Sequence, residues 1–211
     1  MSDMDNYEVS RDRAQAYFLN FDQQAIIDRW GLRNDGDYLH LTFLSRDYRI
    51  HRKTGRVERV PGGIQADFSE VLSIFDLLCH EGEDQFLTGK YAPVNSLRGC
   101  PVSVGVDAEF HEKTAHYFDK NPELLKNACI ALGGMPVNMG DIGFVLPLFD
   151  KIHVILKFYH SDEDFPASIT LLWDENTLHF LFYETVFYIA GFLLSRISEE
   201  MSKAEQEGGS V

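Results

Sequence analysis

Signatures of nucleophilic catalysis and nucleotide binding are missing from this sequence. It contains no GxSxG elbow, no glycine-rich loop that ends in Gly-Lys-Ser or Gly-Lys-Thr, and no GxGxxG turn after a strand. Gly133, Gly134, Gly140 and Gly143 are therefore interpreted as turn residues. No serine or cysteine has a base partner that spacing alone identifies, so the catalytic residues, if any exist, are unknown at this stage.

Cysteine is scarce and odd in number. Cys79, Cys100 and Cys129 are spaced too widely for a paired CxxC zinc site, and three residues cannot form a complete disulfide framework. We interpret them as buried free thiols.

Neither a leader nor a membrane-spanning segment is predicted. The first thirteen residues are acidic and polar without an apolar core, so no secretory signal is predicted. The longest apolar run, around residues 186–194, is shorter than the about 20 residues that a spanning helix needs. We expect a cytoplasmic protein that does not bind membranes.

Positive charge is in deficit, with 19 Lys and Arg against 33 Asp and Glu and a formal net charge of −14. This charge disfavours binding to nucleic acid and to anionic lipid, and it favours cationic partners and metal ions. Six of the cations nevertheless lie within residues 46–59: Arg46, Arg49, Arg52, Lys53, Arg56 and Arg59. They form either a docking face for an acidic partner or a solvated, charged sheet edge that resists aggregation.

What is present is an ordinary globular composition, 45% hydrophobic and 25% charged. Alternating apolar residues predict two groups of short strands with tight connections, which favour antiparallel pairing. The groups cover about 38–60 and 141–173. Apolar residues at helical spacing predict amphipathic helices at 64–80, 121–132 and 184–201 that cover the sheet. The sequence therefore predicts an α+β fold in one domain over residues 1–206, followed by a flexible tail at 207–211.

The sharpest polar cluster is the turn His160-Ser161-Asp162-Glu163-Asp164, which lies between two predicted strands. Three consecutive carboxylates suit a hard metal ion or acid and base chemistry. The alternative is a solvated hairpin tip in which Asp side chains accept backbone hydrogen bonds. A metal site needs further ligands, and Asp141 and Glu184 are the candidates.

Glu184 stands between apolar neighbours near the start of the last predicted helix. One interpretation is a partly buried carboxylate with a functional partner. The other is an acidic first-turn residue that the helix dipole stabilises.

Several short motifs resemble a known family. Leu132-Gly133-Gly134, Gly140-Asp141, the turn 162–167, the strand end 171–174 and Glu184 occur in its order and at its approximate spacing. They are similar to an uncharacterised bacterial family, domain of unknown function 3786. The resemblance covers the C-terminal part of the chain well and the opening helix and strands more loosely. Ser161 replaces a glycine usual in the family and Thr185 an acid, which argues against a strict acidic metal site.

That resemblance implies no known activity. Some family members look fused to iron-sulfur domains and occur in anaerobes, which implies an accessory role in redox or cofactor metabolism. From the residues, we expect a non-catalytic binding or accessory module that holds a protein partner or a small ligand. The predicted contact residues are His160, Asp162, Glu163, Asp164 and Glu184.

The competing interpretation is a metal-assisted hydrolytic enzyme with a divalent ion as cofactor. Its predicted metal ligands are Asp141, Asp162, Asp164 and Glu184. A third interpretation is an interaction protein that docks through the basic segment 46–59.

Overall fold

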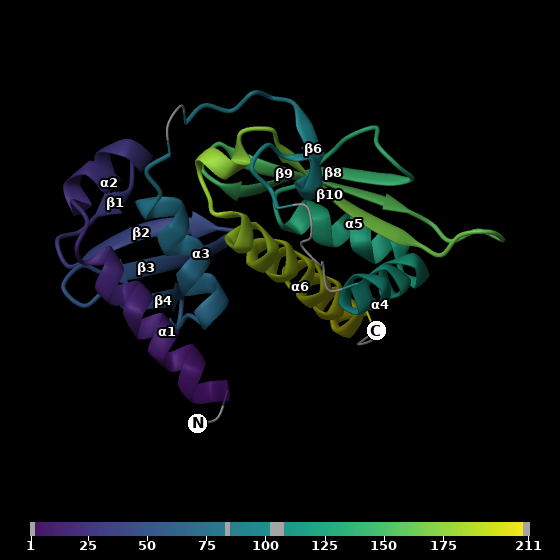
Figure 1. The fold of residues 1–211 in the computed structure, drawn as a ribbon. Coiled ribbons are helices and arrows are strands. Elements are labelled where there is room, and N and C mark those ends of the chain that lie inside the picture. Colours follow the sequence, from purple (N-terminus) through teal and green to yellow (C-terminus); the bar gives the residue numbers. More distant parts are fainter. Residues whose placement is uncertain (1–2, 83–84, 102–107, 209–211) are drawn as a thin grey trace. The chain divides into compact units, whose positions relative to one another are not determined.

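The computed structural model describes residues 3–82, 85–101 and 108–208, which fall into two compact units (Figure 1). The first unit is formed by the described residues up to Gln85 together with His179–Ile189, and the second by Phe86–Leu178 together with the residues from Ala190 onward. The single domain predicted over residues 1–206 stays a prediction. The last helix, α6 (Tyr183–Gly208), includes the first two residues of the predicted tail, and residues 209–211 lie outside the described part.

The first unit contains a five-stranded antiparallel sheet in the order β1-β2-β3-β4-β5. The strands are β1 (Arg33–Asn34), β2 (Tyr38–Phe43), β3 (Arg46–His51), β4 (Val57–Val60) and β5 (Ile64–Gln65). The strand group predicted over residues 38–60 is therefore present as β2, β3 and β4, with a short edge strand added on each side. Leu44 and Ser45 turn β2 into β3 with positive φ angles.

Three helices belong to the first unit: α1 (Asp3–Phe18), α2 (Gln23–Trp30) and α3 (Phe68–Cys79). Phe18 of α1 stacks on Phe75 of α3 with ring centroids 4.7 Å apart, and Figure 1 shows both helices across one face of β2–β4. The helix predicted from residue 64 begins four residues later, because Asp67 and Glu70 form a reciprocal capping box. Ile64 instead lies on the edge strand β5 and is 61% exposed.

Residues from the far end of the chain complete this core. Phe180, Leu181, Val186 and Ile189 are buried, and the Phe180 ring lies 6.4 Å from the ring of Trp30. The backbone N–H of Phe182 donates to Asp76 Oδ2 at 2.9 Å, so a carboxylate of α3 satisfies a donor at the start of α6.

The second unit contains a separate antiparallel sheet in the order β6-β10-β9-β8-β7. Its strands are β6 (Tyr91–Pro93), β7 (Met135–Pro136), β8 (Ile142–Phe149), β9 (Ile152–Tyr159) and β10 (Ser168–Asp174). The prediction that both strand groups belong to one sheet is wrong, because in the described part of the chain the strands within 33–65 pair only with one another and the strands within 91–174 form a second sheet. The predicted α+β class with antiparallel strands is confirmed.

Helices α4 (Ala108–Lys120) and α5 (Pro122–Ala131) pack on β10 and β8 respectively. Figure 1 shows both helices and the later part of α6 on one side of this sheet. Pro122 at the first position of α5 confirms the start predicted after Asn121.

All three cysteines carry free thiols. Cys79 and Cys129 are buried, and burial raises the pKa of each thiol to about 12, so both stay protonated at neutral pH. Cys100 is half-buried, so the prediction of buried thiols holds for two of the three.

Candidate functional site

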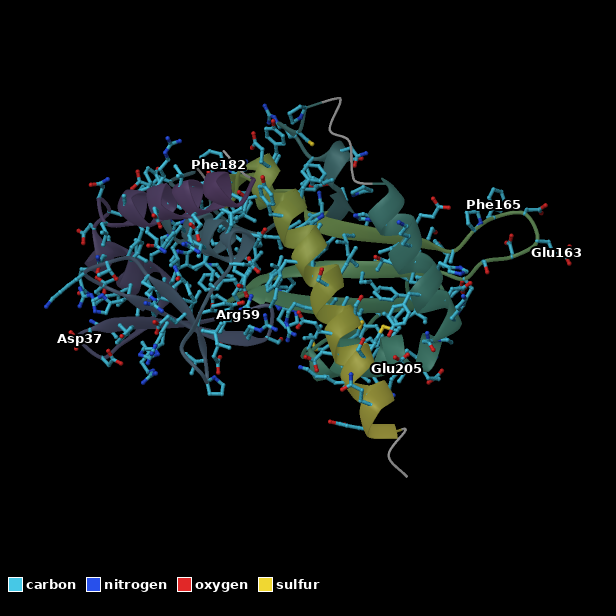
Figure 2. The ribbon with its side chains drawn as sticks, turned by 90° about the horizontal axis from the view of Figure 1, so that it is seen from below. Asp37, Arg59, Glu163, Phe165, Phe182 and Glu205 are labelled. Atoms are coloured by element: carbon cyan, nitrogen blue, oxygen red, sulfur yellow. The ribbon has the colours of Figure 1, made fainter. Side chains whose placement is uncertain are left out.

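The loop His160–Ala167, which joins β9 to β10, is the candidate site. The strand pairing ends at Tyr159 and Ser168, and residues 160–166 are all exposed. Figure 2 shows Glu163 and Phe165 at the outer end of this loop. Phe165 is 70% exposed, which is the largest exposure of any large apolar side chain in the described residues.

Asp119, in the last turn of α4, holds the base of the loop through two residues. Its Oδ1 lies 2.7 Å from His160 Nδ1, and its Oδ2 accepts the Ser161 hydroxyl at 2.5 Å. Phe118 is fully buried with its ring 6.5 Å from that of Phe158 on β9, which packs this end of α4 beside the loop. Hydrogen bonds from Ser161 and then His160 lower the pKa of the Asp119 carboxyl, so it is ionised at neutral pH.

Asp141, the residue before β8, also binds the base of the loop at His160. Its Oδ2 accepts the His160 backbone N–H at 2.8 Å, and its own N–H donates to the Phe158 carbonyl at 2.9 Å. This close approach depends on Gly140, where φ is +66° and a Cβ would lie 2.6 Å from the Phe158 oxygen. The glycine therefore positions the carboxylate that anchors the loop.

Asp162 closes the outer turn on itself. Its Oδ1 accepts the backbone N–H groups of Asp164 at 2.9 Å and Phe165 at 2.8 Å, and its N–H donates to the Phe165 carbonyl. This is the Asx-type turn that the hairpin-tip interpretation predicts. Asp162 shapes the loop, while the side chains of Glu163 and Asp164 form no ion pair within the described part of the chain.

His160 is the chemically versatile group of this cluster. Because an ionised carboxylate only accepts, its bond to Asp119 assigns the ring proton to Nδ1 and leaves the Nε2 lone pair available. The side chain is 40% exposed, so Nε2 of the neutral ring is able to accept a hydrogen bond or to bind a metal. Ser161 bonds to the carboxylate and not to Nε2, so the three groups are not linked as in a nucleophilic triad.

Glu184 lies apart from this cluster in sequence and belongs to the first unit. It is exposed and occupies the first turn of α6, the position that the helix-dipole interpretation predicts. The interpretation of a partly buried carboxylate is not borne out by its exposure.

The predicted metal ligands are placed as follows. Asp141 and Asp162 each bond backbone N–H groups, and Asp164 lies at the loop tip. Within residues 3–82, 85–101 and 108–208, no group of three or more His, Cys, Asp and Glu side chains is arranged to hold a metal ion. The divalent metal site on Asp141, Asp162, Asp164 and Glu184 stays a prediction.

Sequence reasoning missed Asp119. It precedes His160 by 41 residues, and a single aspartate in the last turn of a helix carries no local signal. Tertiary packing of α4, including Phe118 against Phe158, brings it to the loop.

Four of the six cations in the basic segment 46–59 form ion pairs with glutamates of the same unit. Glu70 is fully buried and accepts from Arg59 Nε at 2.8 Å, from Tyr48 Oη at 2.5 Å and from Arg46 at 3.3 Å. Burial raises the pKa of Glu70, but the hydrogen bonds from Arg59 and Tyr48 outweigh it, and the net direction is downward. Burial and the Glu70 charge raise the pKa of the Tyr48 hydroxyl.

Glu58 on β4 forms ion pairs with two further arginines. Arg49 approaches its Oε2 at 2.6 Å and Arg56 its Oε1 at 2.9 Å. Arg49 also lies over the ring of Tyr38 at 4.6 Å. Four of the six cations are thus held in ion pairs within the chain, but two carboxylates balance only two positive charges, so docking of an acidic partner on this segment stays a prediction.

A family model described as a domain of unknown function, DUF3786, matches residues 22–196. No curated protein matches the chain. No solved structure matches it either. Among the described helices, none combines the length and the apolar character needed to cross a bilayer.

Proposed function

The chain belongs to the family described as domain of unknown function 3786, and we propose that it is a cytoplasmic, non-catalytic binding or accessory module that contacts its ligand through the β9–β10 loop. The observation that carries the proposal is the way the loop is held. Two carboxylates from outside the loop, Asp119 and Asp141, fix its base, and Asp162 fixes its outer turn. The loop is thus preorganised, while its tip is left exposed.

Preorganisation favours binding because less conformational entropy is lost when a partner docks. His160 offers Nε2 at the base, and Glu163 and Asp164 offer carboxylates at the tip. Glu184 belongs to the first unit, and its exposure is the one observation that supports it as a proposed ligand contact.

A loop replacement tests this proposal. The triple variant Glu163→Gly, Asp164→Ser, Phe165→Gly removes the tip and keeps Asp162 and both anchors. The matched control, Asp150→Gly with Lys151→Ser, changes the turn at the other end of β9. Tagged wild-type and variant proteins are purified from the source cells, and their bound proteins and small molecules are quantified by mass spectrometry.

We expect at least one stoichiometric ligand to be retained by the wild type and the control and to be lost from the loop variant. If the loop variant retains every ligand of the wild type, the loop is not the binding element and the proposal is wrong.

The second candidate is a metal-assisted hydrolytic enzyme, and the Asp119–His160 pair favours it. A histidine that donates one ring N–H to a carboxylate and presents the other nitrogen is the usual arrangement around metal-bound imidazole. Elemental analysis and native mass spectrometry of protein purified without added metal distinguish the two functions. A stoichiometric metal that His160→Ala removes supports the enzyme, whereas metal-free protein with a bound partner supports the binding module.

A further inference from the structure

Building on the proposed function of the β9–β10 loop, we infer that its ligand is a protein with an apolar pocket bordered by lysine and arginine side chains. Phe165 is the group that enters the pocket, and Glu163 and Asp164 meet the basic border. The inference rests on three features of the loop tip: an exposed aromatic ring, unpaired acidic neighbours and a fixed backbone.

The exposed ring indicates an apolar contact. Phe165 is 70% exposed. Its backbone is fixed by the Asp162 side chain, which accepts the Phe165 N–H at 2.8 Å, and by its own carbonyl, which accepts the Asp162 N–H at 2.9 Å. Figure 2 shows the Phe165 region projecting away from the strands. Aromatic side chains presented this way act as central anchors of protein interfaces.

The neighbouring charges indicate the border of the pocket. Glu163 and Asp164 have no ion-pair partner in the described residues. Opposite charges around an apolar anchor orient the encounter and accelerate association, and their effect decreases with added salt. An acidic or neutral border would leave these carboxylates repelled or desolvated without compensation.

A second copy of the chain fits this description poorly. Each copy carries a net charge of −14, so copies repel one another. Four of the six cations at 46–59 are already bonded to Glu58 or Glu70: Arg46, Arg49, Arg56 and Arg59. Nucleic acid and anionic membranes are disfavoured by the same acidic tip. A basic protein partner is the occupant that these charges favour.

Site-specific photo-crosslinking tests the inference. Phe165→p-benzoylphenylalanine keeps an aromatic ring at the tip and crosslinks what lies against it in living cells. Phe182→p-benzoylphenylalanine is the matched control, because Phe182 is also exposed, at 58%, but lies in the first unit. The crosslinked protein is identified, its crosslinked residue is mapped, and its affinity for purified full-length chain is measured.

We expect the crosslink to form at position 165 and not at 182, within an apolar site that lysine or arginine residues surround. Phe165→Ala should then weaken the affinity at least about tenfold, as expected of an interface anchor. Glu163→Gln with Asp164→Asn should weaken it about two- to fivefold at low salt, chiefly through slower association, and this difference should vanish at high salt.

Other outcomes overturn the inference. They are a crosslink to a second copy, to lipid or to an acidic surface, no crosslink at position 165, and an affinity that Phe165→Ala or salt leaves unchanged. The loop replacement described under the proposed function distinguishes a failure of this inference from a failure of the proposed function. If its ligand is still lost, the loop remains the binding element and only the stated partner chemistry is wrong.

Discussion

The basic segment 46–59 and the acidic turn 162–164 differ in whether the fold supplies them with opposite charges. In the basic segment, Glu58 and Glu70 form ion pairs with four arginines, and three of these, Arg46, Arg49 and Arg59, lie on paired strands. The acidic residues lie on a loop beyond the sheet, where Asp162 is used to shape the turn and Glu163 and Asp164 keep their charge exposed. Equal density of charge along a sequence therefore does not imply an equal charge at the surface.

The two clusters differ because a helix of the same unit brings an opposite charge to one of them. Glu70 enters the basic cluster from α3, because the capping box that starts this helix points its carboxylate toward Arg59 and Tyr48. No described cation reaches the acidic tip in the same way. A cluster with an internal partner stabilises the fold, whereas a cluster without one is available for binding.

Removing the charge of Glu70 should have the largest effect. Glu70→Gln removes the buried carboxylate that pairs with Arg46 and Arg59, although Arg59 keeps its contact with Asp67 at 3.2 Å, and breaking such a buried pair costs about 3–5 kcal/mol of unfolding free energy. Urea denaturation in a Trp173→Phe background reports this through Trp30 alone, since the chain has two tryptophans and Trp30 lies in the first unit. The exposed control Glu205→Gln should change the unfolding free energy by less than about 0.5 kcal/mol. An equally small loss in Glu70→Gln would contradict the internal role of this carboxylate.

The same carboxylate predicts a pH dependence. Because the net shift lowers its folded-state pKa, Glu70 stabilises the first unit fully above the unfolded value of about 4.3 and ceases to do so as the pH falls through the lower folded value. Glu70→Gln should therefore remove this part of the acid sensitivity in urea denaturation series below neutral pH. Acid curves with the same slope in both proteins would contradict it.

Glu58 should be less important than Glu70. Its partners Arg49 and Arg56 are 36% and 51% exposed, so Glu58→Gln releases them into water rather than into the core. We expect a loss of about 1–2 kcal/mol in the same denaturation assay. A loss as large as that of Glu70→Gln would show that exposure does not set the difference.

Asp119→Asn should loosen the loop with little effect on global stability. The substitution weakens the bonds to His160 and Ser161, for an expected loss of about 0.5–1 kcal/mol in unfolding free energy. Hydrogen–deuterium exchange of residues 160–166 should accelerate about tenfold at neutral pH. In the wild type the protection of these amides, corrected for the intrinsic exchange rate at each pH, should fall in the same way on acidification, when the carboxyl with its lowered pKa protonates. Unchanged exchange in the variant would show that the anchor is unnecessary.

Glu163→Gln with Asp164→Asn should have the smallest effect on stability. Neither side chain bonds another described residue, so the unfolding free energy should stay within about 0.5 kcal/mol of the wild type. A clear destabilisation would mean that the acidic tip, like the basic segment, serves the fold.

The elements that could be predicted are those whose pattern is local. The strands β8, β9 and β10 together span residues 142–174, within a residue of the strand group predicted at 141–173, because turn residues interrupt the apolar pattern. The edge strands β1, β5, β6 and β7 have two or three residues each and are defined by their pairing alone. Ile64 continued an apolar helical stripe in the sequence, but the capping box at Asp67 overrides that pattern.

The candidate site divides in the same way. Local chemistry accounts for Asp162 and Glu184. Asp162 accepts backbone hydrogen bonds, as the hairpin-tip interpretation predicts, and Glu184 lies in the first turn of α6, as the helix-dipole interpretation predicts. The anchors at Asp119 and Asp141 depend on tertiary packing and on Gly140, which no spacing rule connects to His160.

The order of the two units along the chain has a consequence for biosynthesis. The first unit needs Phe180, Leu181, Val186 and Ile189 for its core, but these residues follow every strand of the second unit. A ribosome must therefore translate β10 before the N-terminal sheet and its helices can complete their packing. The part of the protein that is made first therefore cannot complete its core until residue 189 has been translated.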